Sequence, residues 1–236
     1  MEPREEPERP SSGELESEDR SASEDEAPAE DPSAPATRLP GDEVDEDEPE
    51  PPLIPPAPDT LAGHVIVSGS VGLVVPFGSF QDGASQTSAV GVGPGFQLDI
   101  GIGVSRPVEL GIWGQTLNLG DGDCTSCSLT SHAFGAFVRY HLVQGVRFDP
   151  WMSAGIGYRL ATLSGLPGGD IDYSGIEWLR LQVGGDWYPF RVFGFGPFLE
   201  LDMGIYGKRS PGSLGDAAPH WQFWSGLRIS LDVPGK

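Results

Sequence analysis

Lysine is almost missing from this chain of 236 residues: only Lys208 and Lys236 are present, and neither falls within a run that reads as a strand. The formal net charge of −21 leaves no basic face of the kind that phosphate backbones require, so nucleic acid is excluded as a partner. No run of about 18 apolar residues exists, which excludes a membrane-spanning helix. Residues 1–5 contain neither a basic region nor an apolar core, so no secretory signal is visible, and export would need a leader that this sequence does not include.

Acidic residues and proline are concentrated in the first quarter of the chain, where glycine is scarce. Residues 1–60 hold 21 of the 35 acidic residues, 4 of the 14 basic ones and 13 of the 23 prolines, but only 2 of the 34 glycines. Such a segment has too little apolar surface to offset the entropy lost on ordering, so we predict that residues 1–60 are disordered. A solvated spacer is favoured over a partner-binding arm. Residues 61–236 have the length of one ordinary domain.

The domain is dominated by alternation with a period of two. From 220 to 233, apolar Leu227 and Ile229 alternate with polar Arg228 and Ser230, which is typical of a β-strand with one apolar and one polar face. Eight such runs are recognised, at about 64–77, 96–104, 108–115, 134–142, 152–160, 179–187, 199–205 and 220–233. Long polar connections near 79–92, 120–130, 164–175 and 210–219 alternate with short ones at 105–107, 143–147 and 189–191. The pattern predicts an all-β, eight-stranded antiparallel up-and-down barrel with long loops at one end.

The charged residues decide which face of this sheet is inside. A water-soluble barrel would present an exterior rich in lysine and glutamate, which these strands lack. The polar face instead combines glycine, serine and glutamine with a nearly matched set of ions. We expect these ions to pair inside the lumen, because arginine binds carboxylates through two donors and stays charged when confined. The lumenal charge network is predicted to consist of Asp99, Glu109, Arg139, Arg159, Arg180, Asp186, Glu200, Asp202 and Arg228.

Aromatic residues on the apolar face are sorted toward the two ends of the strands. Near the long loops lie Phe96, Phe134, Trp221 and Phe223; near the short turns lie Tyr140, Trp187 and Phe195. Two aromatic belts around an aliphatic band are typical of barrels that cross a membrane, so we predict a transmembrane barrel. Glycines on the polar face are expected to leave room inside for Trp113, Phe137, Trp178 and Trp224.

The strand texture, for example residues 151–158 (WMSAGIGY), gives the chain a family resemblance. Residues 62–233 resemble small bacterial outer-membrane β-barrels of the OmpA-like and OmpW-like kind. The resemblance implies a monomer in outer-membrane lipid, inserted by the barrel-assembly machinery, with both chain ends on the periplasmic side. That machinery reads a last strand of alternating apolar residues ending in an aromatic. Here Leu227, Ile229, Leu231 and Val233 fit, but Pro234-Gly235-Lys236 replaces the terminal phenylalanine.

Cys124 and Cys127 form a CxxC pair in the second long connection. A zinc site would need two further ligands, and His132 is the only histidine nearby, so we expect no metal. A redox motif would open a helix within a βαβ unit, which this pattern lacks. A structural disulfide that joins Cys124 to Cys127 is the favoured interpretation, in keeping with an oxidising compartment.

Three uses of the lumenal ions remain open: a structural plug, a gate and a proton path. The plug is favoured, because side chains fill the interior of an eight-stranded barrel. Catalysis is disfavoured, because His220 lies near the loop rim while the nearby Ser225 has lipid parity and no carboxylate is placed to orient the histidine. We therefore predict a structural or surface-interactive outer-membrane protein without a cofactor, with an unknown ligand or partner possible at the long loops. The alternatives are a narrow channel for small apolar solutes, a lipid-modifying enzyme and a soluble lipocalin-like binder.

Overall fold

The computed structural model describes residues 60–81, 83–120, 122–124, 126–213 and 215–234. The described residues all belong to one compact unit, residues 50–236. The disorder predicted for residues 1–60 therefore concerns a segment that, apart from Thr60, lies outside the described residues.

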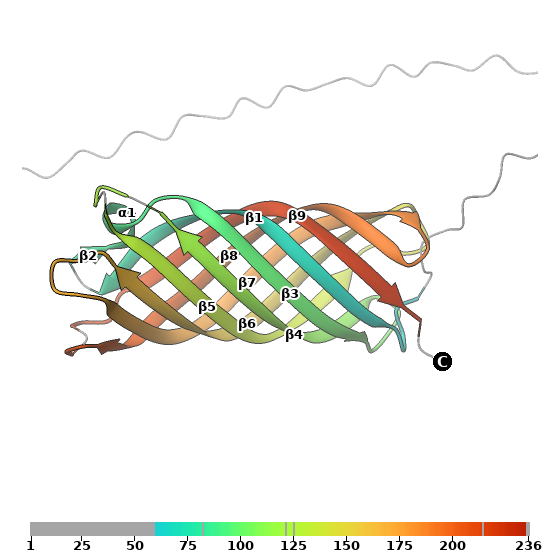
Figure 1. Ribbon diagram of the computed structural model, residues 1–236. Coiled ribbons are helices and arrows are strands. Elements are labelled where there is room, and N and C mark those ends of the chain that lie inside the picture. Colours follow the sequence, from blue (N-terminus) through green and yellow to red (C-terminus); the bar gives the residue numbers. More distant parts are fainter. Residues whose placement is uncertain (1–59, 82, 121, 125, 214, 235–236) are drawn as a thin grey trace, which may run out of the picture. The chain divides into compact units, whose positions relative to one another are not determined.

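Eight long strands form one antiparallel sheet in chain order, closed by pairing of the first strand with the last (Figure 1). They are β1 (Val65–Gln81), β3 (Gly93–Gly103), β4 (Val108–Leu119), β5 (Ser128–His141), β6 (Phe148–Ser164), β7 (Ile171–Phe190), β8 (Phe193–Ser210) and β9 (Pro219–Val233). Closure is continuous, because β1 and β9 stay in register from Val65↔Val233 to Gly78↔His220. The predicted eight-stranded antiparallel barrel is confirmed.

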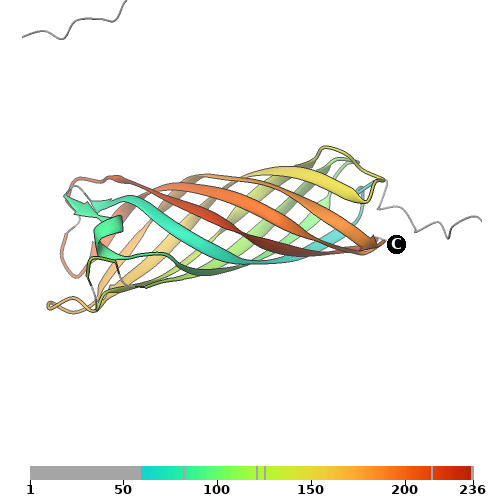
Figure 2. The ribbon, with the colours of Figure 1, turned by 90° about the horizontal axis from the view of Figure 1, so that it is seen from above.

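The connections sort to the two ends of the barrel as predicted. Short turns at 104–107, 142–147 and 191–192 lie at the end where β1 begins and β9 finishes. We call this the short-turn end, and the opposite one the long-loop end; Figure 2 shows both from above. The first long connection holds the two-residue strand β2 (Ala84–Ser85) and the single-turn helix α1 (Gln86–Ala89). Among the described residues, no helix is long and apolar enough to span a membrane.

The apolar side chains face outward and the charged ones inward. Ile112, Ile156 and Leu227 are each more than 60% exposed, whereas Arg139 and Arg159 are fully buried. Glycine allows this close filling of the interior. A Cβ on Gly157 would lie 2.5 Å from the indole of Trp113, and one on Gly184 would lie 2.5 Å from that of Trp151.

Strand β7 contains a bulge, which shifts its alternation of inward and outward side chains by one residue. Its register with both neighbours shifts around Trp178, so the inward series Tyr173, Gly175, Glu177 continues as Arg180 and Gln182. An extra residue in one strand of an antiparallel pair has this effect. The prediction that Trp178 lies inside is therefore wrong: its side chain is exposed on the outer surface.

The strands extend past the apolar band at the long-loop end, and there the facing of polar and apolar residues is reversed. On β4 and β5, Asn118 and Thr130 point outward while Leu117, Leu119 and Leu129 are buried inside. The prediction that no lysine lies in a strand is also wrong, since Lys208 belongs to this extension of β8. A chain that leaves an apolar medium for water is expected to exchange its faces in this way.

Candidate functional site

The lumen of the barrel is the candidate site, and its charges begin near the short-turn end. Arg139 on β5 donates to Asp99 on β3 at 2.9 Å and to Glu109 on β4 at 3.0 Å. His141 continues the chain of contacts, with Nδ1 2.6 Å from Asp149 Oδ2 and Nε2 3.6 Å from Glu109 Oε2. All five side chains are buried. Each carboxylate here is thus held by a cation or an imidazole.

A second arginine near the short-turn end, Arg228 on β9, links β9 to β7 and β1. Arg228 donates to Asp186 and, at 3.0 Å, to the hydroxyl of Ser68, while Ser230 also donates to Asp186 at 3.0 Å. The guanidinium groups of Arg228 and Arg139 lie over the ring of Trp151, at 4.7 and 4.6 Å from its centroid. Cation–π contact with this one ring stabilises both guanidiniums.

The middle of the lumen is crossed by contacts between opposite walls. Glu200 on β8 accepts a bond from Arg180 at 2.9 Å and one from Gln115 on β4 at 2.9 Å, with Gln182 as a third donor. The Arg180 guanidinium lies 4.4 Å from the ring centroid of Trp113. Because β4 and β8 are not neighbours, the Gln115–Glu200 bond spans the interior.

Arg159 forms the layer closest to the long-loop end. It donates to Glu177, to Asp202 at 3.2 Å, to Ser131 at 3.0 Å and to Gln115 at 2.8 Å. These partners come from β4, β5, β7 and β8. Every one of them is buried, so the guanidinium of Arg159 joins its own strand, β6, to four others.

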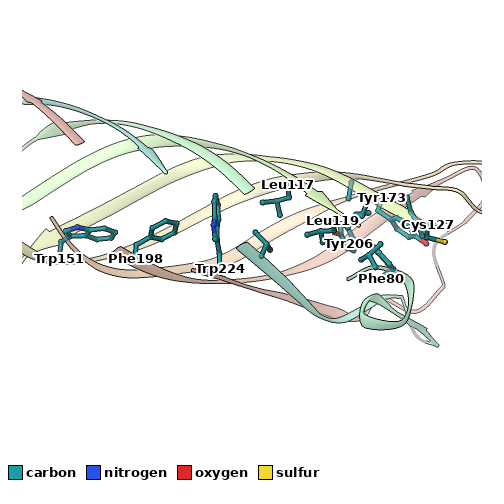
Figure 3. Close-up of a cluster of buried hydrophobic side chains, with 14 residues drawn as sticks. Phe80, Leu117, Leu119, Cys127, Trp151, Tyr173, Phe198, Tyr206 and Trp224 are labelled. Carbon is teal, nitrogen blue, oxygen red and sulfur yellow. The ribbon is translucent and has the colours of Figure 1, made fainter. Parts of the chain in front are cut away.

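A cluster of apolar side chains runs along the lumen from Trp151, at the level of Arg139 and Arg228, to the long-loop end, where it fills the interior beyond the charges; we call it the apolar layer. Figure 3 shows its side chains running along the interior toward the disulfide loop. Phe80 stacks on Tyr173 with ring centroids 4.8 Å apart, and Trp224 meets Phe198 edge-on at 5.4 Å. The apolar cluster comprises Val74, Phe80, Val90, Leu117, Leu119, Cys127, Leu129, Trp151, Ala161, Leu163, Tyr173, Phe198, Tyr206 and Trp224.

The structure places all nine residues of the predicted charge network inside the barrel, each at most 1% exposed. It adds Glu177 to the network. Strict alternation of inward and outward residues, counted back from Arg180, would place Glu177 on the outer face, but the bulge in β7 returns it to the lumen. The structure also adds His141 with Asp149, and His64, whose Nδ1 lies 2.6 Å from Asp232 Oδ1. The latter contact ties the start of β1 to the end of β9. The same alternation counted from Tyr173, at the long-loop end of β7, would have placed Glu177 inside.

The residues considered for catalysis do not come together. His220 is fully buried and stacks on Tyr206 at 4.2 Å, whereas Ser225 lies on the outer face of β9. Cys124 and Cys127 form the predicted disulfide. Across the described part of the chain, no three His, Cys, Asp or Glu side chains are grouped so as to hold a metal ion.

Comparison with known proteins yields structural likeness only. No protein-family model matches the chain, and no curated protein matches it. Neisserial surface protein A is similar at 13% identity over 71% of this chain and 97% of that chain, with a TM-score of 0.49. For OprG from Pseudomonas aeruginosa the identity is 15% over 75% and 99%, with a TM-score of 0.46. For the outer-membrane protease OmpT from Escherichia coli it is 8% over 72% and 96%, with a TM-score of 0.40.

The closure of the sheet and the facing of its residues define the fold. The chain has the architecture of a small eight-stranded bacterial outer-membrane β-barrel, with buried charge pairs inside it.

Proposed function

We propose that the protein is a monomeric, integral outer-membrane barrel with a closed lumen, acting in a structural role or through its long loops at the cell surface. The observation that supports this best is the distribution of polarity between its two faces. Charged side chains are buried at the axis while large apolar ones stay exposed around the band, including Leu98, Ile100, Ile102 and Leu181. In water this surface would be an extensive aggregation site; in lipid it is matched to its surroundings.

A closed lumen is favoured over a channel because three kinds of contact fill it in sequence. Arg139 and Arg228 with their carboxylates fill the short-turn half. The Arg180–Glu200 pair, the Gln115–Glu200 bond and the contacts of Arg159 fill the middle. Apolar side chains such as Phe80, Leu119 and Tyr173 fill the long-loop end. A narrow conduit for small apolar solutes would require these layers to separate. A soluble binder with an apolar cavity is disfavoured, because the lumen between the belts is charged.

A structural or surface role is favoured over lipid modification. Among the described residues no buried acid contacts His220, whose ring stacks on Tyr206 instead, and Ser225 lies on the other face of the sheet. Nucleophilic catalysis needs a base within hydrogen-bond reach of the nucleophile. The β9 residues Leu227, Ile229 and Leu231, exposed on the outer face, fit recognition by the barrel-assembly machinery. This assembly route would leave the short-turn end periplasmic and the long loops outside.

The test is to fold the full chain into detergent micelles and into a planar bilayer. We expect slower migration on SDS gels after heating than before, and no steady single-channel current. Steady openings in the wild-type chain would overturn the closed lumen and support the conduit. A chain that stays dispersed and β-structured without detergent would overturn the membrane assignment. As a control, Gln115→Ala combined with Glu200→Ala removes a bond across the axis but leaves the outer face unchanged.

A further inference from the structure

The boundary of the apolar band can be placed to one residue row on the outer face of β5–β8. One row, in register across the four strands, consists of Phe134, Tyr158, Ile176 and Ile205. The next row toward the long-loop end consists of His132, Leu160, Ser174 and Lys208, and the one beyond it of Thr130, Thr162, Asp172 and Ser210. The outer face thus changes from aromatic and aliphatic to polar across the middle row, where a membrane–water interface is expected.

An apolar hollow lies at this boundary between β7 and β8. It has a volume of about 490 Å³ and is lined by Tyr158, Ile176, Trp178 and Ile205, with Lys208 at its polar margin. Gly207 leaves it open, because a Cβ there would meet no atom within 4 Å. A second hollow of about 530 Å³ adjoins it through the shared residues Ser174 and Lys208. Together they form a groove that runs from the apolar band to the polar rim.

The polar margin of this groove carries the positive charge of Lys208. Six lysine and arginine side chains lie on the described strands. Four of them are buried in the lumen, Arg209 is half-buried beside the second hollow, and Lys208 alone is exposed on the outer face. Across the described residues, no carboxylate lies within 4.0 Å of the Lys208 ammonium. Asp172, the nearest acid by row, accepts a bond from Thr162 at 2.7 Å. The ammonium is thus available to an anion that approaches along the groove.

We propose that this groove binds a phosphate-bearing anionic lipid, whose headgroup contacts Lys208 while one acyl chain fills the hollow beside Trp178. The assignment rests on the proposed membrane location. An acyl chain matches a hollow with an almost entirely apolar lining at band depth, and a phosphate matches a cation at the interface. Aromatic rings beside the cation, from Tyr158 and Trp178, are the side chains expected at headgroup level.

The test uses quenching of Trp178 fluorescence by lipids with brominated acyl chains. The full chain is reconstituted in phosphatidylcholine vesicles that contain either brominated phosphatidylglycerol or brominated phosphatidylcholine at equal mole fraction. The difference between wild type and Trp178→Phe isolates the signal of this one indole. We expect enrichment of the anionic lipid at Trp178 by roughly fivefold, the effect of one cation near a bilayer surface.

Matched variants separate charge from shape. Lys208→Gln should abolish the preference for phosphatidylglycerol, whereas Arg147→Gln, which removes the same charge from an exposed short turn, should retain it. Gly207→Leu fills the hollow and should reduce the preference with Lys208 intact. A preference that survives Lys208→Gln overturns the proposal.

The same measurement distinguishes failure of this proposal from failure of the proposed function. Equal quenching by both brominated lipids overturns lipid selectivity but leaves the barrel in the membrane. Absence of quenching by either lipid means that Trp178 does not contact acyl chains, and both proposals then fail.

Discussion

Leu181→Arg places a charge at the middle of the apolar band. Leu181 lies in an outward row with Val138, Ala154 and Leu201, two rows from the Phe134–Ile205 row. Its side chain is 43% exposed, so an arginine can be accommodated without disturbing the interior. Arginine at mid-depth on the lipid face of a barrel costs about 2–4 kcal/mol, falling to about 0–1 kcal/mol near the interface.

Thr130→Arg is the matched control, because Thr130 faces the same way on β5 but lies beyond the band. We expect Leu181→Arg to lower the free energy of unfolding by about 2–4 kcal/mol and Thr130→Arg by less than about 1 kcal/mol. The assay is reversible urea unfolding in phosphatidylcholine vesicles, followed by tryptophan fluorescence. On a water-facing surface both substitutions would stay within about 0.5 kcal/mol of wild type. Equal, small effects would therefore refute a lipid-facing band.

Three further predictions concern the interior and the loop. Arg180→Gln leaves the buried Glu200 carboxylate without its cation and should lower the free energy of unfolding by about 3–5 kcal/mol in the same assay. The double variant Arg180→Gln with Glu200→Gln removes both charges and should lower it clearly less. Equal losses for the two variants would contradict the ion pair. Gly184→Val collides with the Trp151 ring and should cost at least about 1–3 kcal/mol, while Gly114→Ala enters open space and should be near neutral. Comparable unfolding midpoints for these two would contradict the tight lumen. Replacing both Cys124 and Cys127 by serine should cost at most about 2 kcal/mol, because the disulfide closes a very short loop, with a sequence separation of 3; loss of the heat-dependent gel shift would contradict this minor role.

The alternation of residues was sufficient to predict the eight strands, their order and which face is inside. This signal is strong because lipid on one side and confined ions on the other impose opposite demands on neighbouring residues. Arg139 and Val138 illustrate this, as one is fully buried and the other 43% exposed. The disulfide was also predictable, since its two residues are close in sequence.

Two features were not predicted, for identifiable physical reasons. The bulge at Trp178 inserts one residue without breaking the apolar pattern, since Trp178 and the following Leu179 both suit the outer face. The position of Glu177 was consequently missed. The apolar layer was missed because Leu119, Leu129 and Tyr173 lie where polar outward neighbours made the strands read as loops. Outside the band the rule that apolar residues face outward no longer holds.

The most direct test of the account is the environment of Leu181 and Gln182 in a bilayer. With Cys124 and Cys127 joined, a single nitroxide can be attached to a cysteine introduced at either position in the full chain. Power saturation in vesicles should show high accessibility to oxygen and low accessibility to a water-soluble nickel chelate at 181, and low accessibility to both at 182. Free access of the nickel chelate to position 181 would show that this face contacts water, which would contradict the membrane-spanning barrel.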